Sequence, residues 1–179
     1  MRKFIAAAVV VATFGVTACS SPPPPPAAVV HTNSWTQRLA KLKLDLEAAT
    51  QGSGVAIQKT PDNLLKVVIP DELSFDVGRS TVKRNLAQVL DRIADGLRGA
   101  TTASVVVIGH TDSTGGEKNN ERLSVARAES TRDHLVAKGV APATVQTEGR
   151  GEREPVADNG TAAGRAQNRR IEIFVSEKQ

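Results

Sequence analysis

The sequence predicts an α/β (α+β) fold, in which helices pack against a mixed β-sheet in the order β-α-β-α-β-β. One observation is an apolar stripe at helical spacing within Val82–Leu97, which must lie against another layer. A second is the run Ser104–Ile108, which has almost no polar residue, as in central strands that helices cover. A third is the alternation that places Ile171, Ile173 and Val175 on one face of a last strand. Right-handed crossovers between such elements place the helices against the sheet.

The first segment, residues 1–18, has the pattern of a secretory signal. Arg2 and Lys3 precede the apolar run Phe4–Val16, and small residues follow it. Cys19, the single cysteine of the chain, comes directly after them. Because one thiol cannot form an internal disulfide, we interpret Cys19 as the lipidation site of a bacterial lipoprotein. The alternative is an ordinary secretory signal that is cleaved without lipidation.

Residues 19–33 are predicted to form a tether between this anchor and the folded part of the chain. The run Pro22–Pro26 cannot pair in a sheet and favours an extended spacer of ~3.1 Å per residue. Binding of a partner protein to the proline run is the other interpretation.

The charge and the aromatic residues do not indicate nucleic-acid binding. Removing the two bases of residues 1–18 from the total of 23 leaves 21 bases beside 19 acids, a net charge of +2. Only Trp35, Phe75 and Phe174 are aromatic after that segment. A platform for single strands needs several aromatic residues beside a basic stripe, and the sequence has no such group.

Residues 34–51 are predicted to form an amphipathic helix that starts with a capping box of Ser34 and Gln37. Two heptads are too few to specify a coiled coil. The helix therefore either packs on its own domain or mediates self-association or contact with a protein partner. Its apolar residues recur at 4-3-4-3 spacing: Trp35, Leu39, Leu42, Leu46 and Ala49.

The remaining residues, 55–179, are predicted to form the main domain. It begins with a hairpin of two strands, Val55–Thr60 and Leu64–Ile69. We expect Pro70–Arg79 to be a loop and Ser80 to cap the first long helix, which Gly99 ends.

The second half of the domain is predicted to hold the second long helix, Asn120–Lys138, with Asn120 as its N-cap. A strand at Thr144–Glu148, a polar loop at 150–160 and a short helix that contains Asn168 follow. The inward stripe of the long helix consists of Ser124, Ala128, Thr131 and Leu135.

A carboxylate and a guanidinium lie on neighbouring elements in the stretch Gly109–Ala128. Asp112 follows the apolar strand, and Arg127 lies two turns into the helix. Such a pair suits a ligand with both an ammonium and a carboxylate, and the planar guanidinium can bind a carboxylate through two hydrogen bonds. The alternative is a structural salt bridge between loop and helix, which is the commoner role of such pairs.

The same stretch resembles a known family. Residues 109–115 read G-H-T-D-S-T-G, and residues 120–128 read N-E-R-L-S-V-A-R-A. These are the motifs of the OmpA-like peptidoglycan-binding domain, which also occurs in the peptidoglycan-associated lipoprotein. The resemblance covers roughly the last two thirds of the chain, and linked motifs at matching spacing make chance unlikely. It also includes Leu73, Phe75, Asp76, Gly149, Gly151, Glu152 and the run N-R-R-I-E-I from Asn168.

The resemblance implies a non-catalytic protein that binds meso-diaminopimelate in the stem peptide of peptidoglycan, without metal or cofactor. In the family an aspartate at the position of Asp112 binds the ammonium, and an arginine at the position of Arg127 binds the carboxylate. The site residues that match family contact positions are Asp76, Thr111, Asp112, Asn120, Arg127 and Arg169.

The resemblance also implies a location. An acylated Cys19 followed by the non-acidic Ser20 implies export to the outer membrane of a Gram-negative bacterium, with the domain in the periplasm. The loop residues Val77 and Gly78 depart from the polar pair that the family often has at this place. The sequence therefore does not predict whether this loop contacts the ligand.

Two other classes of function compete with this interpretation. A metal-dependent hydrolase would use His110, Asp112 and Asp76, but a catalytic zinc needs about three protein ligands, and His31 and His134 are remote in sequence. We expect His110 to hydrogen-bond within the fold and His134 to lie on a helix face. The second competing class is a structural component of an envelope or secretion complex, which would act through the Trp35–Ala49 helix.

Overall fold

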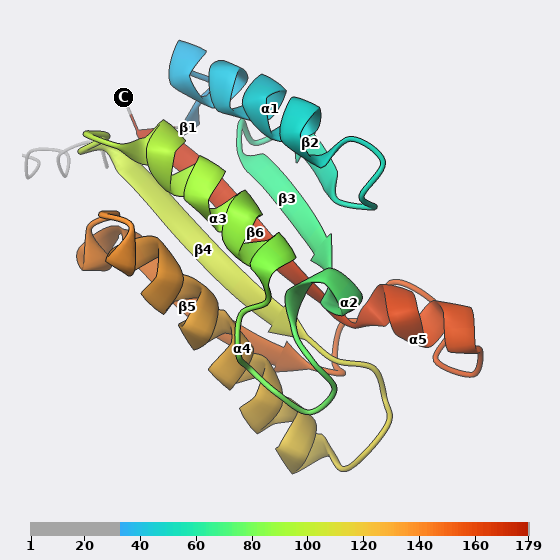
Figure 1. The fold of residues 1–179 in the computed structure, drawn as a ribbon. Helices are drawn as coiled ribbons and strands as arrows, with labels where there is room; N and C mark the ends of the chain where they lie inside the picture. The colour runs from blue at the N-terminus through green and yellow to red at the C-terminus, as the bar shows by residue number, and fades with distance from the viewer. Residues whose placement is uncertain (1–32, 179) are drawn as a thin grey trace, which may run out of the picture. The chain divides into compact units, whose positions relative to one another are not determined.

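The computed structural model describes residues 33–178, which form one mixed β-sheet with helices packed on one face (Figure 1). The sheet order is β2-β3-β6-β4-β5, and β1 pairs with β6 beside this path. β4 and β5 are parallel and the other pairs are antiparallel, so the predicted class is confirmed. The strands are β1 (Asn33–Ser34), β2 (Ala56–Lys59), β3 (Leu65–Pro70), β4 (Ala103–His110), β5 (Val145–Gly151) and β6 (Arg170–Lys178).

Several predictions concern residues outside the described range. They are the signal at residues 1–18, the lipidation of Cys19, the tether up to residue 32 and the place of His31 in it.

Three long helices, α1 (Gln37–Thr50), α3 (Arg84–Leu97) and α4 (Glu117–Ala137), lie side by side over the sheet (Figure 1). Two short helices, α2 (Asp71–Ser74) and α5 (Ala162–Asn168), lie toward the end of the sheet where β4 terminates. A 3-10 turn, η1 (Pro142–Thr144), precedes β5. Of the helices within residues 33–178, none combines the length and hydropathy that crossing a membrane requires.

The core lies between the sheet and these helices. Alternate residues of the central strands are buried because successive side chains point to opposite faces. The buried strand residues are Leu65, Val67, Ile69, Val105, Val107, Ile171, Ile173 and Val175. They meet the apolar stripe of α3, which the sequence predicted: Leu86, Val89, Leu90, Ile93 and Leu97.

Helix α1 packs on its own domain, as one of the two interpretations predicted. Leu39, Leu42 and Leu46 are buried in the same core. The capping box was wrong, because Ser34 belongs to β1, where its backbone pairs with Glu177. Thr36 is the N-cap instead, and its Oγ1 accepts a hydrogen bond from Leu39 N at 3.1 Å.

The starts of the other two long helices were also predicted wrongly. Helix α3 begins at Arg84, and its N-cap is Lys83 rather than Ser80. Lys83 has an extended backbone, and its N–H donates to Ser74 O at 2.9 Å. The expected loop Pro70–Arg79 contains the short helix α2.

Helix α4 begins at Glu117 with Gly116 as N-cap, so Asn120 lies in its first turn and caps nothing. Asn120 Nδ2 donates instead to Asp112 O at 3.2 Å. The predicted inward stripe is confirmed, since Ser124, Ala128, Thr131 and Leu135 are all fully buried.

Candidate functional site

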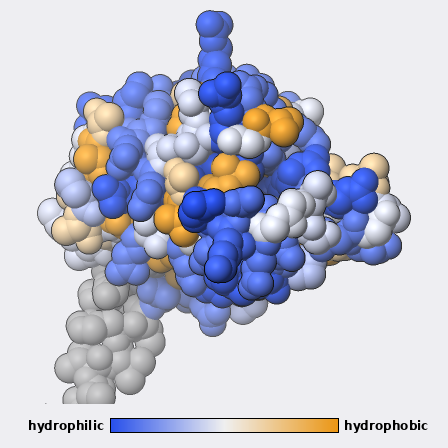
Figure 2. Space-filling model, turned by 90° about the horizontal axis from the view of Figure 1, so that it is seen from below, coloured by the Kyte–Doolittle hydropathy of each residue, from blue (hydrophilic) through white to orange (hydrophobic). Residues whose placement is uncertain are grey.

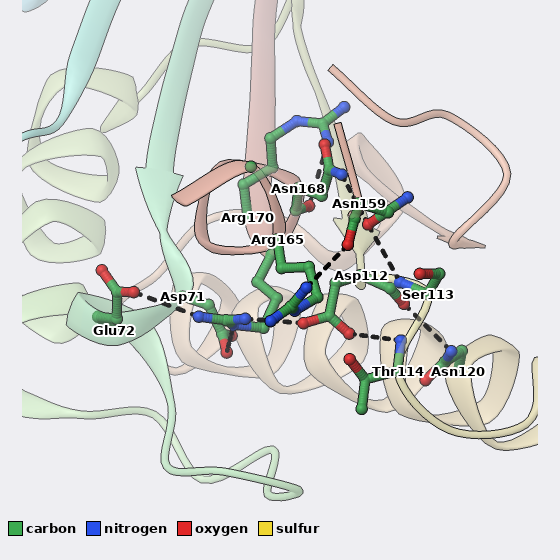
Figure 3. Close-up of polar contacts among 12 residues, drawn as sticks. Asp71, Glu72, Asp112, Ser113, Thr114, Asn120, Asn159, Arg165, Asn168 and Arg170 are labelled. Carbon is green, nitrogen blue, oxygen red and sulfur yellow. Dashed lines mark hydrogen bonds and ion pairs between the residues drawn. The ribbon is translucent and has the colours of Figure 1, made fainter. Parts of the chain in front are cut away.

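The predicted site residues gather at the end of the sheet where β4 terminates. Asp112 lies just after β4, Asn120 and Arg127 lie on α4, and Arg169 precedes β6. Figure 3 shows Asp112 on one side of the cluster, with Asp71 and Glu72 of α2 on the other. Seen from this end, the surface of the domain is mostly hydrophilic, and its hydrophobic residues form small separate patches (Figure 2).

Asp112 is a buried carboxylate with both oxygens bonded. Its Oδ2 accepts a hydrogen bond from Arg169 Nη1 at 2.7 Å, and its Oδ1 accepts one from Thr114 N at 2.8 Å (Figure 3). Burial raises the pKa of Asp112, but the hydrogen bonds from Arg169 and Thr114 outweigh it and hold the pKa below its usual range. Asp112 is therefore ionised at neutral pH and favours a cation as partner.

Arg127 is buried, and its guanidinium is held on three sides. Its Nη1 lies 2.9 Å from Asp71 Oδ1, and its Nε donates to Arg79 O at 2.9 Å. Its Nη2 donates to Asp76 O at 3.4 Å, and the group lies over the ring of Phe75, 5.1 Å from the centroid. Burial lowers the pKa of Arg127, and the Asp71 carboxylate opposes this effect.

Asp112 and Arg127 are thus paired with other residues rather than with each other, and the structural salt bridge considered from the sequence is not formed between them. Arg169 connects the two pairs. Its Nε lies 4.0 Å from Asp71 Oδ2, and its Nη2 lies 3.3 Å from Glu72 Oε1. The result is a chain of alternating charge, which we call the ion-pair chain: Arg127, Asp71, Arg169 and Asp112.

Asp71 is a buried carboxylate that lies between two guanidinium groups. Burial raises the pKa of its carboxyl group, whereas the nearby guanidinium groups of Arg127 and Arg169 lower it by less. Asp71 was missed at the sequence level because Pro70–Arg79 was taken as a loop. Proline followed by two acids, at residues 70–72, is a signal of a helix start that could have revealed α2.

The other predicted residues differ in how they join the cluster. Asn120 is buried, and its Nδ2 donates to Glu152 Oε2 at 2.5 Å as well as to Asp112 O. Thr111 is buried, and its Oγ1 has no hydrogen-bond partner among residues 33–178. Asp76 joins the cluster through its backbone carbonyl, which accepts the hydrogen bond from Arg127. Its carboxylate is exposed and lies 3.6 Å from Lys83 Nζ. Val77, beside it, is 99% exposed.

A polar loop, residues 152–161, borders the cluster and is held by the fully buried Asn168. The Asn168 side chain accepts hydrogen bonds from the backbone N–H groups of Val156 and Ala157 and donates one to Asn159 Oδ1. Asn159 Oδ1 also accepts one from Ser113 N at 3.3 Å, which links this loop to the residue after Asp112 (Figure 3).

The histidines give one confirmation and one correction. His134 lies on a face of α4 as predicted, with Nε2 2.7 Å from Asp91 Oδ1. His110 was expected to hydrogen-bond within the fold, but neither of its buried ring nitrogens has a partner among residues 33–178. Burial and the charge of Arg170 lower the pKa of His110 to about 4. Within residues 33–178, no group of three or more His, Cys, Asp or Glu residues is arranged to hold a metal ion.

Comparison with known proteins identifies relatives of the domain. Residues 74–169 match the model of the OmpA family. The chain is 40% identical over 126 residues to the probable lipoprotein YiaD of Escherichia coli K12, covering 70% of this chain and 57% of the relative. It is 46% identical over 89 residues to the peptidoglycan-binding protein ArfA of Mycobacterium tuberculosis, covering 50% of this chain and 27% of the relative.

A solved structure extends the similarity. The cell wall anchor of the T6SS from Pseudomonas aeruginosa is 35% identical, with a TM-score of 0.64. The match covers 78% of this chain and 96% of that one. By contrast, the chain spans a little over half of the length of YiaD.

Proposed function

The chain belongs to the OmpA family, and on that premise we propose that it binds the stem peptide of peptidoglycan non-covalently and without catalysis. The proposed ligand group is one amino-acid centre of meso-diaminopimelate, which carries an ammonium and a carboxylate. We further propose that a lipid on Cys19 anchors the chain in the outer membrane, so that binding tethers this membrane to the cell wall. Relatives named as a cell wall anchor and a peptidoglycan-binding protein support the proposal.

The observation that carries the proposal is the ion-pair chain at one end of the sheet. It combines a carboxylate with a lowered pKa, Asp112, with the guanidinium groups of Arg127 and Arg169. An ammonium fits beside Asp112, and a carboxylate fits on a planar guanidinium, which offers two parallel N–H donors. A zwitterion can use both kinds of group at once, whereas a singly charged ligand uses one.

The expected loss of affinity follows from the energy of hydrogen bonds between charged groups. A hydrogen bond to a charged group contributes about 1.5–3 kcal/mol, and removing one partner leaves the other charge uncompensated. Because ~1.4 kcal/mol is a factor of ten in affinity, losing either ligand charge should weaken binding at least tenfold.

The test measures binding of purified protein to isolated sacculi, with free meso-diaminopimelate as competitor. We expect Asp112→Ala to bind at least tenfold more weakly, and Arg127→Lys to lose much of the affinity because an ammonium cannot reproduce the two-pronged contact. Arg127→Ala should also lose binding, but it leaves the buried Asp71 with only Arg169, 4.0 Å away, so its melting temperature must be measured on the same sample.

A matched control is Asp95→Asn, which removes one negative charge from an exposed ion pair with Arg98 at the C-terminal end of α3. This variant should bind like the wild type. Near-wild-type binding by folded Asp112→Ala protein would contradict the proposed site.

A second candidate function is a structural role in an envelope or secretion complex. The similarity to the T6SS anchor over almost all of that chain favours it. Contact through the Trp35–Ala49 helix is limited to its outer face, where Leu44 is 65% exposed, because the three leucines of its apolar seam are buried against the domain. Sacculus binding that survives Leu44→Glu while a co-purifying protein is lost would separate the two functions.

A further inference from the structure

We propose that Asp71 sets the affinity of this site by competing with the ligand carboxylate for Arg127. The inference rests on the proposed function and adds a residue to it, since Asp71 matches no position predicted to touch the ligand. It also explains how a buried arginine can take part in binding.

The first step concerns access to Arg127. This side chain is 2% exposed, and each of its three nitrogens already has a partner. These partners use three of the five N–H donors of the guanidinium. Because the side chain is also buried, a ligand carboxylate reaches the guanidinium only if a group that covers it moves. Two partners are the backbone carbonyls of Asp76 and Arg79, which are joined in one turn by the hydrogen bond from Arg79 N to Asp76 O at 3.0 Å. The third is the Asp71 side chain.

The second step concerns chemical identity. The Asp71 carboxylate is the same group as the ligand carboxylate, so it occupies Arg127 as the ligand would. In the same way the Arg169 guanidinium, 2.7 Å from Asp112, stands where the ligand ammonium would bind. The site without ligand is therefore closed by its own ion pairs.

The third step is an exchange of partners. When a zwitterion takes Arg127 and Asp112, Asp71 and Arg169 are released together, and these two already lie 4.0 Å apart. They can pair with each other, so no buried charge is left alone. A ligand with a carboxylate alone frees only Asp71 while Arg169 stays on Asp112, so the buried Asp71 keeps only the 4.0 Å contact with Arg169, and a poorly compensated buried charge is costly. The exchange thus favours zwitterionic ligands over ligands that carry a carboxylate alone.

The decisive variant is Asp71→Asn, which keeps the shape and one acceptor oxygen but removes the competing charge. We expect it to bind free meso-diaminopimelate at least threefold more tightly than the wild type, measured by calorimetry or NMR titration on the mature chain. Asp95→Asn, with the same change in net charge, should bind like the wild type. Equal or weaker binding by folded Asp71→Asn protein, with wild-type binding intact, overturns the competition and leaves the proposed function standing.

A measurement on the unmodified protein covers the case in which Asp71→Asn does not fold. Asp71 faces Arg127 of α4, Arg169 before β6 and Glu72 of its own helix. Its pKa is raised while that of Asp112 is lowered, so acidification protonates Asp71 first. Binding should then strengthen as the pH is lowered from 7, because a neutral Asp71 no longer holds Arg127 and the ligand keeps both charges.

Below pH 7 a folded Asp71→Asn variant should show a flatter profile than the wild type. Wild-type affinity that is constant or falls on acidification overturns the role of Asp71. Absence of any diaminopimelate binding, or equal binding by Asp112→Ala, would instead remove the proposed function itself.

Discussion

At the scale of single residues, His110 is a buried side chain whose polar atoms are not compensated by hydrogen bonds in the part of the chain that the structure describes. It is 2% exposed at the end of β4, and both ring nitrogens lack partners within residues 33–178. The cost of charging it there is visible in its pKa of about 4, against an ordinary value of 6.5. The ring therefore stays neutral in the folded protein at any pH above this value.

This shift predicts how stability depends on pH. Above pH 6.5 the ring is neutral in both states, so His110 adds no pH dependence. Between pH 6.5 and about 4, His110 binds a proton in the unfolded chain but not in the folded one. The free energy of unfolding therefore falls by about 3 kcal/mol over this range. His110→Leu loses no hydrogen bond, so its denaturation free energy should be flatter between pH 6.5 and 4.5. Identical slopes for variant and wild type would contradict the assignment.

At the scale of elements, two glycines let α4 lie directly on β4 and β5 and so fix where Arg127 lies relative to Asp112. A Cβ on Gly109 would stand 2.3 Å from Ser124 O, and one on Gly149 would stand 2.5 Å from Val125 Cγ2. The first clash is with helix backbone, which cannot rotate away. Ser124 Oγ also accepts a hydrogen bond from Gly151 N at 3.0 Å, which ties the helix to β5.

Gly109→Ala should therefore destabilise the protein by about 1–3 kcal/mol, the usual cost of overpacking, and should weaken sacculus binding through displacement of α4. Gly116→Ala is the control for added volume, because a Cβ there meets nothing within 4 Å and this N-cap of α4 should show only the smaller capping preference against alanine. Denaturant unfolding of the two variants checks this, and equal stability would show that α4 can move without cost.

Helix α1 gives a second prediction at this scale. Leu42 packs against Gly96 of α3, and Glu177 of β6 holds the start of α1 through Thr36 and through Arg38 Nε at 2.9 Å. Leu42→Ala should lower the free energy of unfolding by about 2–5 kcal/mol, whereas exposed Leu44→Ala should change it by less than ~0.5 kcal/mol.

A minimal binding domain should accordingly begin near Asn33, and one that begins at Gly52 should melt at a lower temperature. Equal melting of the two fragments would mean that α1 is dispensable.

At the scale of the whole molecule, the proposed function needs two separate parts of the chain. One is a lipid at Cys19, and the other is the binding site of the domain. We expect Cys19→Ser to release the protein from outer membranes into the soluble periplasmic fraction, because acyl chains contribute ~0.8 kcal/mol per buried CH₂. The released protein should still bind sacculi, which separates anchoring from recognition. Quantitative recovery of Cys19→Ser with the outer membrane would refute the lipid anchor.

The elements with a local signal could be predicted from the sequence. The apolar stripe of α3, the inward stripe of α4 and the alternation of β6 follow from periodicity, because a helix or strand repeats its buried face at fixed spacing. The motif from Gly109 to Ala128, through its family resemblance, also predicts Asp112 and Arg127 as ligand-binding residues, and this assignment stays a prediction. Helix starts were less predictable, since Ser34, Ser80 and Asn120 have the right chemistry for caps but other contacts fix the boundaries.

The partners of the charged residues, by contrast, depend on how the chain folds in three dimensions. Arg169 meets Asp112 across 57 positions of sequence, and Asp71, on a short helix, meets Arg127 of a helix far away in the sequence. No local pattern encodes such pairs, because they depend on which loops and helices meet at one end of the sheet. The same is true of His110, whose isolation from hydrogen-bond partners is a property of the packed domain.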